Sequence, residues 1–291
     1  ITLISHLGFP QDMQLLSEVQ GVDVCLSGHT HNRLYKPARQ GKTLVIQSGS
    51  HGSFLGRLDL SIEEGRVVGY RHQLMEVQAC IDPDPVVADL VRQAVAPYHD
   101  ELSTVVGETA TALNRNTTLE TTMDNFLLQA LLEGTDAQLA FSNGWRYGAP
   151  VVPGKITLND LYNMVPMNPP VSTVELTGAE IVAMLEENLE RTFARDPYDQ
   201  MGGYVKRCLG LDAYIKIENP PGQRVQEIFV GDEPLQPEHS YSAAFVTEQG
   251  VAPKYGRNRQ RQPERTVETL EAYLAKHHPL RADLRGTFVA V

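Results

Sequence analysis

Residues 22–31 read Val-Asp-Val-Cys-Leu-Ser-Gly-His-Thr-His, a short apolar strand that runs into two histidines one residue apart. An earlier apolar run, residues 1–5, also runs into a histidine, and residues 11–19 between the two runs have the apolar spacing of a short helix. Strands joined in this way usually lie side by side, and α/β proteins place their sites at the carboxyl edge of such strands. We therefore expect three histidines at one sheet edge: His6, His29 and His31.

Histidines gathered at a sheet edge are typical ligands of a transition metal. Neutral imidazole binds zinc, manganese, iron or nickel, and three imidazoles form a partial metal shell. Gly28 would let the backbone approach closely at this point. The pattern also fits a polar turn in which the two neighbouring histidines bind nothing.

Five short stretches carry a resemblance to a known family. They are Ser-His-Leu-Gly-Phe at 5–9, Gly-Val-Asp-Val at 21–24, Gly-His-Thr-His at 28–31, Gln-Ser-Gly-Ser-His-Gly at 47–52 and Leu-Gly-Arg-Leu-Asp-Leu at 55–60. In order and spacing they resemble the last third of the calcineurin-like metallophosphoesterase domain of 5′-nucleotidases. Residues from about 105 onward resemble that family's C-terminal substrate domain, most clearly at 120–127, 141–144, 156–161 and 174–178.

The resemblance implies an α/β fold, a truncated metallophosphoesterase sandwich followed by an α+β 5′-nucleotidase-type C-terminal domain. Residues 1–78 would form the first part, 79–104 a linker helix and 105–291 the substrate domain. The pattern of residues predicts helices at 86–102, 121–133 and 176–193, and a basic polar loop at 254–265.

The resemblance implies two divalent metal ions in the intact protein, manganese or zinc. His6 and His29 would bind one ion and His31 the other. The family's other ligands and its catalytic residues precede the strand that contains Ile1, so we expect a C-terminal part of a longer protein that does not catalyse alone.

The substrate loops depart from those of the nucleotidases. Met167 stands where the family has one aromatic ring of a base clamp, and the second clamp segment reads Ala244 to Gln249 without its Gly-Gly-Asp-Gly. The loop at 143–148 and the segments 196–198 and 202–207 resemble instead the thiosulfohydrolase branch of the sulfur-oxidation pathway. The resemblance implies four substrate-binding residues: Asn143, Arg146, Lys206 and Arg207. Alternatively, Trp145 and Tyr147 cover the domain core and Arg146 pairs with an acidic neighbour.

Three functions remain open from the sequence. The first is a metal-dependent hydrolase of a phosphoric ester, the second a thiosulfohydrolase-like enzyme acting on a sulfur-bearing group, and the third a non-catalytic binding module. A small anionic substrate, a phosphate ester or a sulfur anion, fits the first two.

Composition narrows the partners. The net charge of −11 argues against nucleic acid, whose phosphates need a basic surface. No apolar run approaches the about 20 residues of a membrane span, and the three cysteines show no paired spacing. Relatives imply a periplasmic or extracellular location. We expect His51, His72, His99, His239, His277 and His278 to be surface or loop histidines, with His51 the closest to the expected site.

Overall fold

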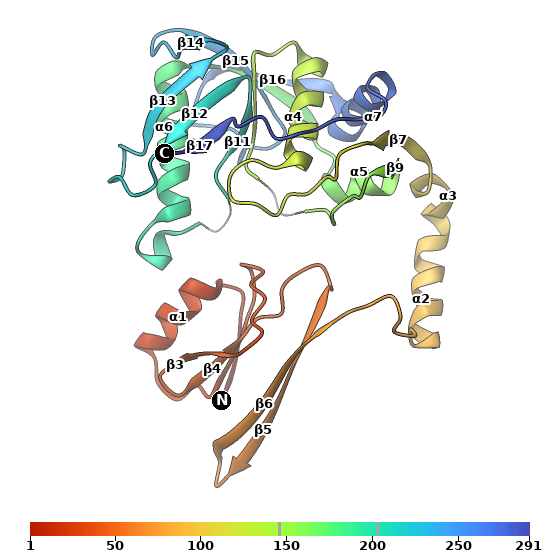
Figure 1. Cartoon of the computed structure of the whole chain (residues 1–291), viewed down its shortest axis with the longest axis vertical. Helices are drawn as coiled ribbons and strands as arrows, with labels where there is room; N and C mark the ends of the chain where they lie inside the picture. Colours follow the sequence, from red (N-terminus) through yellow and green to blue (C-terminus); the bar gives the residue numbers. More distant parts are fainter. Residues whose placement is uncertain (145–146, 202–203) are drawn as a thin grey trace. The chain divides into compact units, whose positions relative to one another are not determined.

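The structure is a computed structural model that describes residues 1–144, 147–201 and 204–291. Its chain divides into two units, one formed by Ile1–Arg92 with Arg195–Gly202, the other by Gln93–Ala194 with Gly203–Val291. The expected α/β class is confirmed, since helices and mixed sheets alternate along the chain (Figure 1). No helix in the described ranges is long and apolar enough to span a bilayer.

The first unit contains a four-stranded sheet with the strand order β1-β2-β4-β3, and a separate hairpin of β5 and β6. Its core is small: Leu16 of α1 packs against Cys25 and Val45 of the sheet. The elements are β1 (Thr2–Ser5), α1 (Phe9–Glu18), β2 (Val24–Ser27), β3 (Ala38–Gln40), β4 (Thr43–Ile46), β5 (Phe54–Glu63), β6 (Arg66–Glu76) and the 3-10 helix η2 (Pro197–Asp199).

The helix expected at 86–102 is interrupted. It consists of α2 (Pro85–Val95), the 3-10 turn η1 (Ala96–Tyr98) and α3 (His99–Leu102). Pro97 lies in the first turn of η1 and has no backbone N–H to continue the α-helical hydrogen bonds, so the long helix cannot pass through it.

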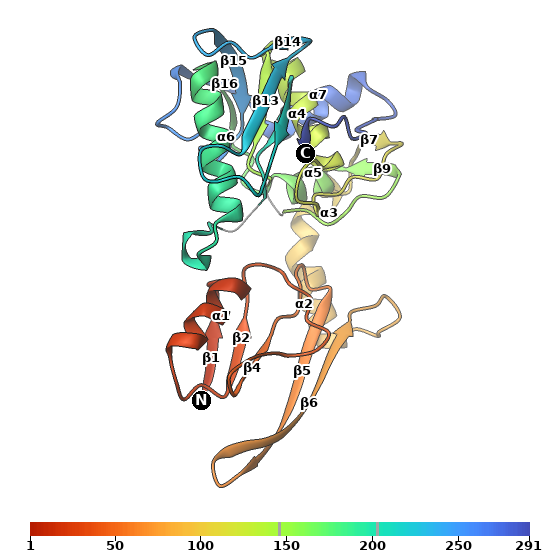
Figure 2. The same cartoon turned by 60° about the vertical axis from the view of Figure 1, so that its left-hand side comes forward.

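The second unit is built on a five-stranded sheet with the order β11-β8-β15-β10-β16. The helices α4 and α7 cover one face, where Phe126 and Leu270 are fully buried, and α6 packs on the other face with β12 and β13 (Figure 2). The elements are β7 (Val105–Thr109), α4 (Thr122–Thr135), β8 (Leu139–Ser142), β9 (Gly154–Thr157), α5 (Leu158–Met164), β10 (Pro170–Thr177), α6 (Gly178–Phe193), β11 (Arg207–Leu209), β12 (Leu211–Ile215), β13 (Val225–Val230), β14 (Glu233–Pro234), β15 (Ser240–Phe245), β16 (Arg257–Arg265), α7 (Thr266–Lys276) and β17 (Phe288–Ala290).

Two expectations about this unit are corrected. The helix expected from Leu176 begins at Gly178, because Thr177 caps it: its side chain accepts from the Glu180 N–H while the Glu180 carboxylate accepts from the Thr177 N–H. The basic segment expected to be a loop is the edge strand β16, which pairs with β10 through its backbone. The prediction of a loop from the polar side chains was wrong, because an edge strand can carry polar residues on both faces.

Candidate functional site

The first unit brings His6 and His29 together. Strands β1 and β2 pair in parallel, with Ser5 opposite Ser27, so His6 and Gly28 follow at the same edge, as the sequence predicted. The ring centroids of His6 and His29 lie 5.1 Å apart. A Cβ atom at Gly28 would stand 3.1 Å from Nδ1 of His6, closer than side chains normally pack. Glycine at this position therefore lets the two rings meet.

His31 lies beside His51, the loop histidine that we expected to be closest to the site. The ring centroids of His31 and His51 are 5.7 Å apart. His29, His31 and His51 all have positive φ, at 68°, 59° and 57°. Residues other than glycine rarely adopt this conformation, and such strain is concentrated at functional sites. The one signal of His51 in the sequence was its Gly-rich loop after a strand.

Buried polar side chains fix the loop that carries these histidines. The carboxylate of Asp12, which is fully buried, accepts hydrogen bonds from the hydroxyls of Ser5 and Ser27 at the ends of β1 and β2. The side chain of Gln47, 2% exposed, donates to the Gly28 carbonyl and accepts from the Asn32 N–H at 2.6 Å. The hydrogen bonds of Asp12 and Gln47 therefore fix the backbone that carries the imidazoles.

The pair of rings fits part of a metal shell. Two imidazoles bound to one ion at about 2.1 Å place their ring centroids roughly 5 Å apart, as His6 and His29 are. Within residues 1–144, 147–201 and 204–291, no group of three or more His, Cys, Asp or Glu residues could hold an ion.

The expected substrate residues belong to the second unit. Asn143 follows β8 and donates from Nδ2 to Oε1 of Gln249 at 3.2 Å. Arg146 lies outside the described residues. Lys206 and Arg207 are 5% and 2% exposed, and both donate to backbone carbonyls. The structure gives these two cations internal partners, so direct contact with an anion stays an unsupported prediction for them.

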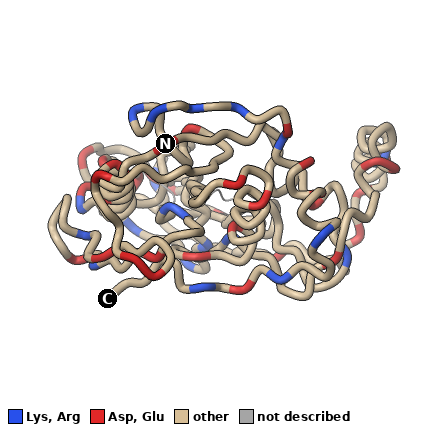
Figure 3. The backbone as a smooth tube through the Cα atoms, turned by 90° about the horizontal axis from the view of Figure 1, so that it is seen from above, with Lys and Arg blue, Asp and Glu red and all other residues tan. Residues whose placement is uncertain are grey.

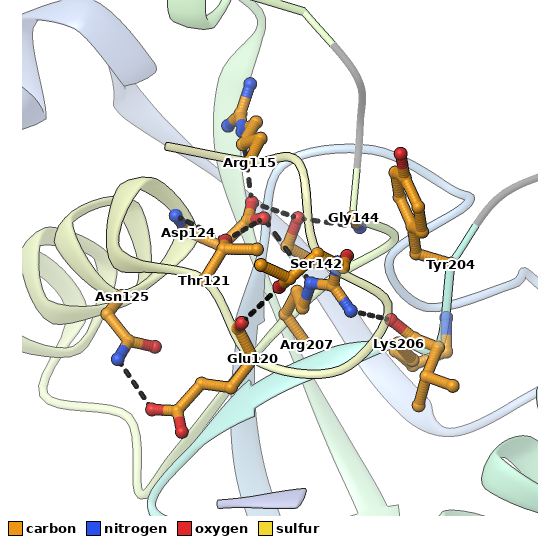
Figure 4. Close-up of polar contacts among 12 residues, drawn as sticks. Arg115, Glu120, Thr121, Asp124, Asn125, Ser142, Gly144, Tyr204, Lys206 and Arg207 are labelled. Carbon is orange, nitrogen blue, oxygen red and sulfur yellow. Dashed lines mark hydrogen bonds and ion pairs between the residues drawn. The ribbon is translucent and has the colours of Figure 1, made fainter. Parts of the chain in front are cut away.

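A buried cluster of charged residues surrounds Asp124, as Figure 4 shows. We call it the Asp124 cluster; its members are Arg115, Thr121, Asp124, Ser142 and Arg207. Oδ1 of Asp124 lies 3.3 Å from Nε of Arg115 and accepts from the Ser142 hydroxyl at 3.1 Å. Oδ2 accepts from the Thr121 hydroxyl at 2.8 Å and lies 3.6 Å from Nε of Arg207. Burial lowers the pKa of Arg207, and the nearby Asp124 carboxylate opposes that effect.

Sequence reasoning missed this cluster. Asp124 is fully buried, and Arg115 is 3% exposed. The signal that could have found it is a charged residue inside an apolar helix: Asp124 stands at the start of α4 among residues that are otherwise almost all buried. A charge is rarely placed there unless it is paired.

Lys206 is the titratable group whose pH dependence the structure predicts most clearly. Burial lowers its pKa from 10.5 to about 8, partly offset by the charge of Glu187. Between pH 8 and 10.5 the unfolded chain keeps a proton on this amine that the folded chain has lost, so the folded state gains stability as pH rises. We expect the unfolding free energy of the wild type, relative to Lys206→Met, to rise by roughly 3 kcal/mol between pH 7 and 10.5. Urea unfolding of both proteins across this range measures the difference, and a constant difference contradicts the prediction.

The aromatic residues near the expected base clamp are used elsewhere. Met167 is 78% exposed, whereas Phe245 is only 2% exposed and has the guanidinium of Arg259 over its ring, 4.7 Å from the centroid. The ring of Tyr204 faces the guanidinium of Arg207 at 5.2 Å. Phe245 thus offers no open face on which a base could stack.

Charge over the chain is mixed. Acidic and basic residues are interspersed along the backbone (Figure 3). Many of the cations are paired, for example Arg57 and Arg71 with Asp59, and Lys254 with Glu187. These exposed pairs contribute little to stability, and they leave the net charge negative.

Comparison with known proteins agrees with the sequence motifs. The protein-family model of the 5′-nucleotidase C-terminal domain matches residues 102–247 of this chain. The trifunctional nucleotide phosphoesterase protein YfkN of Bacillus subtilis (strain 168) is 29% identical over 243 residues, which cover 78% of this chain and 16% of YfkN.

Two solved structures superpose on the whole chain. The sulfate thiohydrolase SoxB of Thermus thermophilus, in complex with glycerol, has a TM-score of 0.92 and 29% identity, and this chain covers 54% of it. A 5′-nucleotidase precursor from Thermus thermophilus has a TM-score of 0.83 and 21% identity, with 64% of that chain covered, and shows the shared fold. The chain therefore spans between a sixth and two thirds of the length of these three proteins.

Proposed function

Because this chain belongs to the 5′-nucleotidase family, we propose that it forms part of a metal-dependent hydrolase that cleaves a phosphoric ester. The observation that carries the proposal is the meeting of His6 and His29 at the ends of two adjacent parallel strands. We assign these two imidazoles to one divalent ion, manganese or zinc, and His31 to a second. The relatives' names, nucleotide phosphoesterase and 5′-nucleotidase, denote hydrolases of this chemistry.

Bound divalent ions supply Lewis-acid stabilisation of a phosphoryl group and lower the pKa of water. The chain's own residues would bind the ions and hold the binding loop in position. Neutral imidazoles serve as ligands, while Asp12 and Gln47 keep the strand ends and the Gly28 loop in place beneath them. Such supporting contacts typically change metal affinity 10- to 100-fold when removed.

We assign recognition of a small anionic substrate to the loop after β8. Asn143 and Arg146 remain the proposed contacts with the anion. Lys206 and Arg207 would contribute indirectly, through the backbone carbonyls to which they donate. A guanidinium can bind a phosphate or sulfate oxygen pair through two parallel hydrogen bonds. A periplasmic or extracellular location is part of the same proposal.

A sulfur-bearing substrate is the second candidate, that of a thiosulfohydrolase-like enzyme. It is favoured by the TM-score of 0.92 and the 29% identity to the sulfate thiohydrolase SoxB, and by the engagement of Phe245 with Arg259 in place of a base. Phosphate esters and sulfonated thiols both present a compact oxyanion, so the same loop suits either.

A substrate panel tests the proposal. Nucleoside monophosphates, sugar nucleotides and S-sulfonated thiols are incubated with the full-length protein and Mn²⁺ or Zn²⁺, and released phosphate, sugar phosphate and sulfate are measured. Phosphate release that requires metal supports the first candidate, and sulfate release supports the second. The metal-binding part is contradicted if calorimetry detects no difference between the wild type and His6→Ala, with His99→Ala as the control.

The burial of Phe245 and the guanidinium of Arg259 over its ring predict weak recognition of a nucleobase. We expect adenosine monophosphate to bind no more than about threefold tighter than inorganic phosphate, because stacking on two rings would add roughly 1–3 kcal/mol per ring. Titration calorimetry with both ligands measures the ratio. Binding of adenosine monophosphate 100-fold tighter than phosphate would restore a nucleotide pocket.

A further inference from the structure

The Asp124 cluster joins several segments of the second unit that lie next to the proposed substrate loop. Arg115 donates from Nη1 to the carbonyls of Tyr147, at 3.2 Å, and Met164, at 2.6 Å. Tyr147 stands just after the loop residue Arg146, and Met164 ends α5 shortly before Met167. One guanidinium therefore ties the loop to which we assigned substrate recognition to the end of α5.

Arg207 holds the remaining segments. Its Nη1 donates to the carbonyls of Thr118 and Val205 at 2.6 and 2.8 Å, and its Nη2 donates to that of Thr117 at 2.6 Å. These acceptors lie outside regular elements, in the stretch before α4 and the stretch before β11. Such segments have no sheet or helix to fix them, so the guanidinium supplies the constraint.

Asp124 connects the two guanidiniums. Its two carboxylate oxygens face Arg115 and Arg207 respectively, and Ser142, which donates to Oδ1, also accepts from the Gly144 N–H at 3.3 Å. Directly or through the two guanidiniums, the carboxylate reaches four segments: 115–118, the loop after β8 at Ser142, Gly144 and Tyr147, the end of α5 at Met164, and 205–207. Figure 4 labels Arg115, Ser142, Gly144 and Arg207 among them.

The cluster is expected to lower the stability of the fold, so a purely structural role does not explain it well. It buries two cations with one anion. Nε of Arg115 and Nε of Arg207 reach Asp124 only at ion-pair distances of 3.3 and 3.6 Å, and within the described residues Nη2 of Arg115 donates no hydrogen bond. Buried donors without acceptors destabilise a fold, and a well-packed apolar core is often as stable as a buried ion pair. The excess of one positive charge lies beneath a loop proposed to receive an anion.

We infer that Asp124 is a positioning residue for the anionic substrate, acting through Arg115 and Arg207 on the segments that flank the binding loop. The inference rests on the proposed function, because it takes the loop after β8 to be the substrate loop. It assigns Asp124 no contact with substrate.

Charge and geometry predict opposite results for Asp124→Asn, which makes the test decisive. The substitution keeps the shape and removes the only negative charge of the cluster, so the net positive charge increases. If the cluster attracted the anion by charge alone, binding would tighten. If Asp124 positions the loops, phosphate and sulfate should bind about tenfold more weakly, as measured by calorimetry on the 291-residue chain.

Glu180→Gln is the matched control. Glu180 is also a carboxylate with hydrogen bonds to backbone N–H groups, at Thr177 and Gly256, but it touches none of the four segments. We expect it to lower the unfolding temperature without changing phosphate or sulfate affinity by more than twofold. An equal loss of affinity in both variants would assign Asp124 a structural role and overturn the inference.

Arg115→Lys covers the case in which Asp124→Asn fails to fold. It keeps the charge but loses the planar fork that spans the Tyr147 and Met164 carbonyls. We expect the same loss of anion affinity, with faster amide hydrogen exchange at Gly144 and Tyr147 than in the control. Unchanged or tighter binding in the folded variants overturns the inference, as does a wild type that binds neither anion.

The experiments distinguish a failure of the proposed function from a failure of the positioning inference. If the panel shows no hydrolysis but the anion affinities follow Asp124 as expected, the hydrolase proposal fails and the positioning role stands. Where hydrolysis occurs, Asp124→Asn should raise KM more than it lowers kcat.

Discussion

Replacing His29 by alanine is expected to lower kcat/KM by roughly 100-fold or more in any preparation of the protein that hydrolyses a substrate of the panel. The ring of His29 faces that of His6 at 5.1 Å, so its loss removes one of two ligands assigned to the same ion. The backbone at His29 already has a positive φ, and alanine has the same steric limits there, so the fold should be little affected. Metal content measured together with kcat/KM tests the expectation.

His99→Ala is the control for this experiment. His99 lies in α3 and contacts Asp100, and its side chain is 66% exposed. It should leave metal content and kcat/KM unchanged within twofold. A His29 variant that keeps its metal and its rate would contradict the assignment of the metal site.

Replacing Gly210 by alanine is expected to destabilise the second unit by about 3 kcal/mol. Gly210 connects β11 and β12, which belong to different sheets, and has φ at 88°. A Cβ atom there would stand 2.1 Å from the carbonyl oxygen of Gln138, which belongs to the backbone and cannot rotate away. Urea unfolding, followed by circular dichroism, measures the loss.

Gly222→Ala separates the two causes of that loss. Gly222 also has a positive φ, at 77°, but nothing lies within 4 Å of the added Cβ atom. Only backbone strain remains, so we expect a loss of about 1 kcal/mol. Equal losses at Gly210 and Gly222 would show that the contact with Gln138 relaxes without cost.

The meeting of His6 and His29 at one sheet edge could be predicted from sequence because the information is local. Residues 1–31 contain one strand, one helix and one strand, and their order alone makes β1 and β2 neighbours. The partner of His31 could not be predicted in the same way. His51 reaches it through the loop after β4, and no periodicity in the sequence describes that loop.

The Asp124 cluster was not predictable because its members are distant in sequence. Arg115 precedes α4, Ser142 ends β8 and Arg207 begins β11, and only the tertiary fold brings them to one carboxylate. Arg207 was noticed as a cation available to substrate. Its burial follows from the packing of β11 at the edge of the five-stranded sheet, which composition does not reveal.

The arginine-rich strand β16 also bears on how the protein behaves at high concentration. β16 is an edge of the five-stranded sheet, and an open edge can pair with the same edge of a second molecule. Four arginines, at 257, 259, 261 and 265, would face their own copies in such a pairing, and Pro263 lacks the N–H that a ladder needs. Substitutions that neutralise this strand therefore carry a cost in solubility that no measurement of metal binding, substrate affinity or unfolding in dilute solution would register.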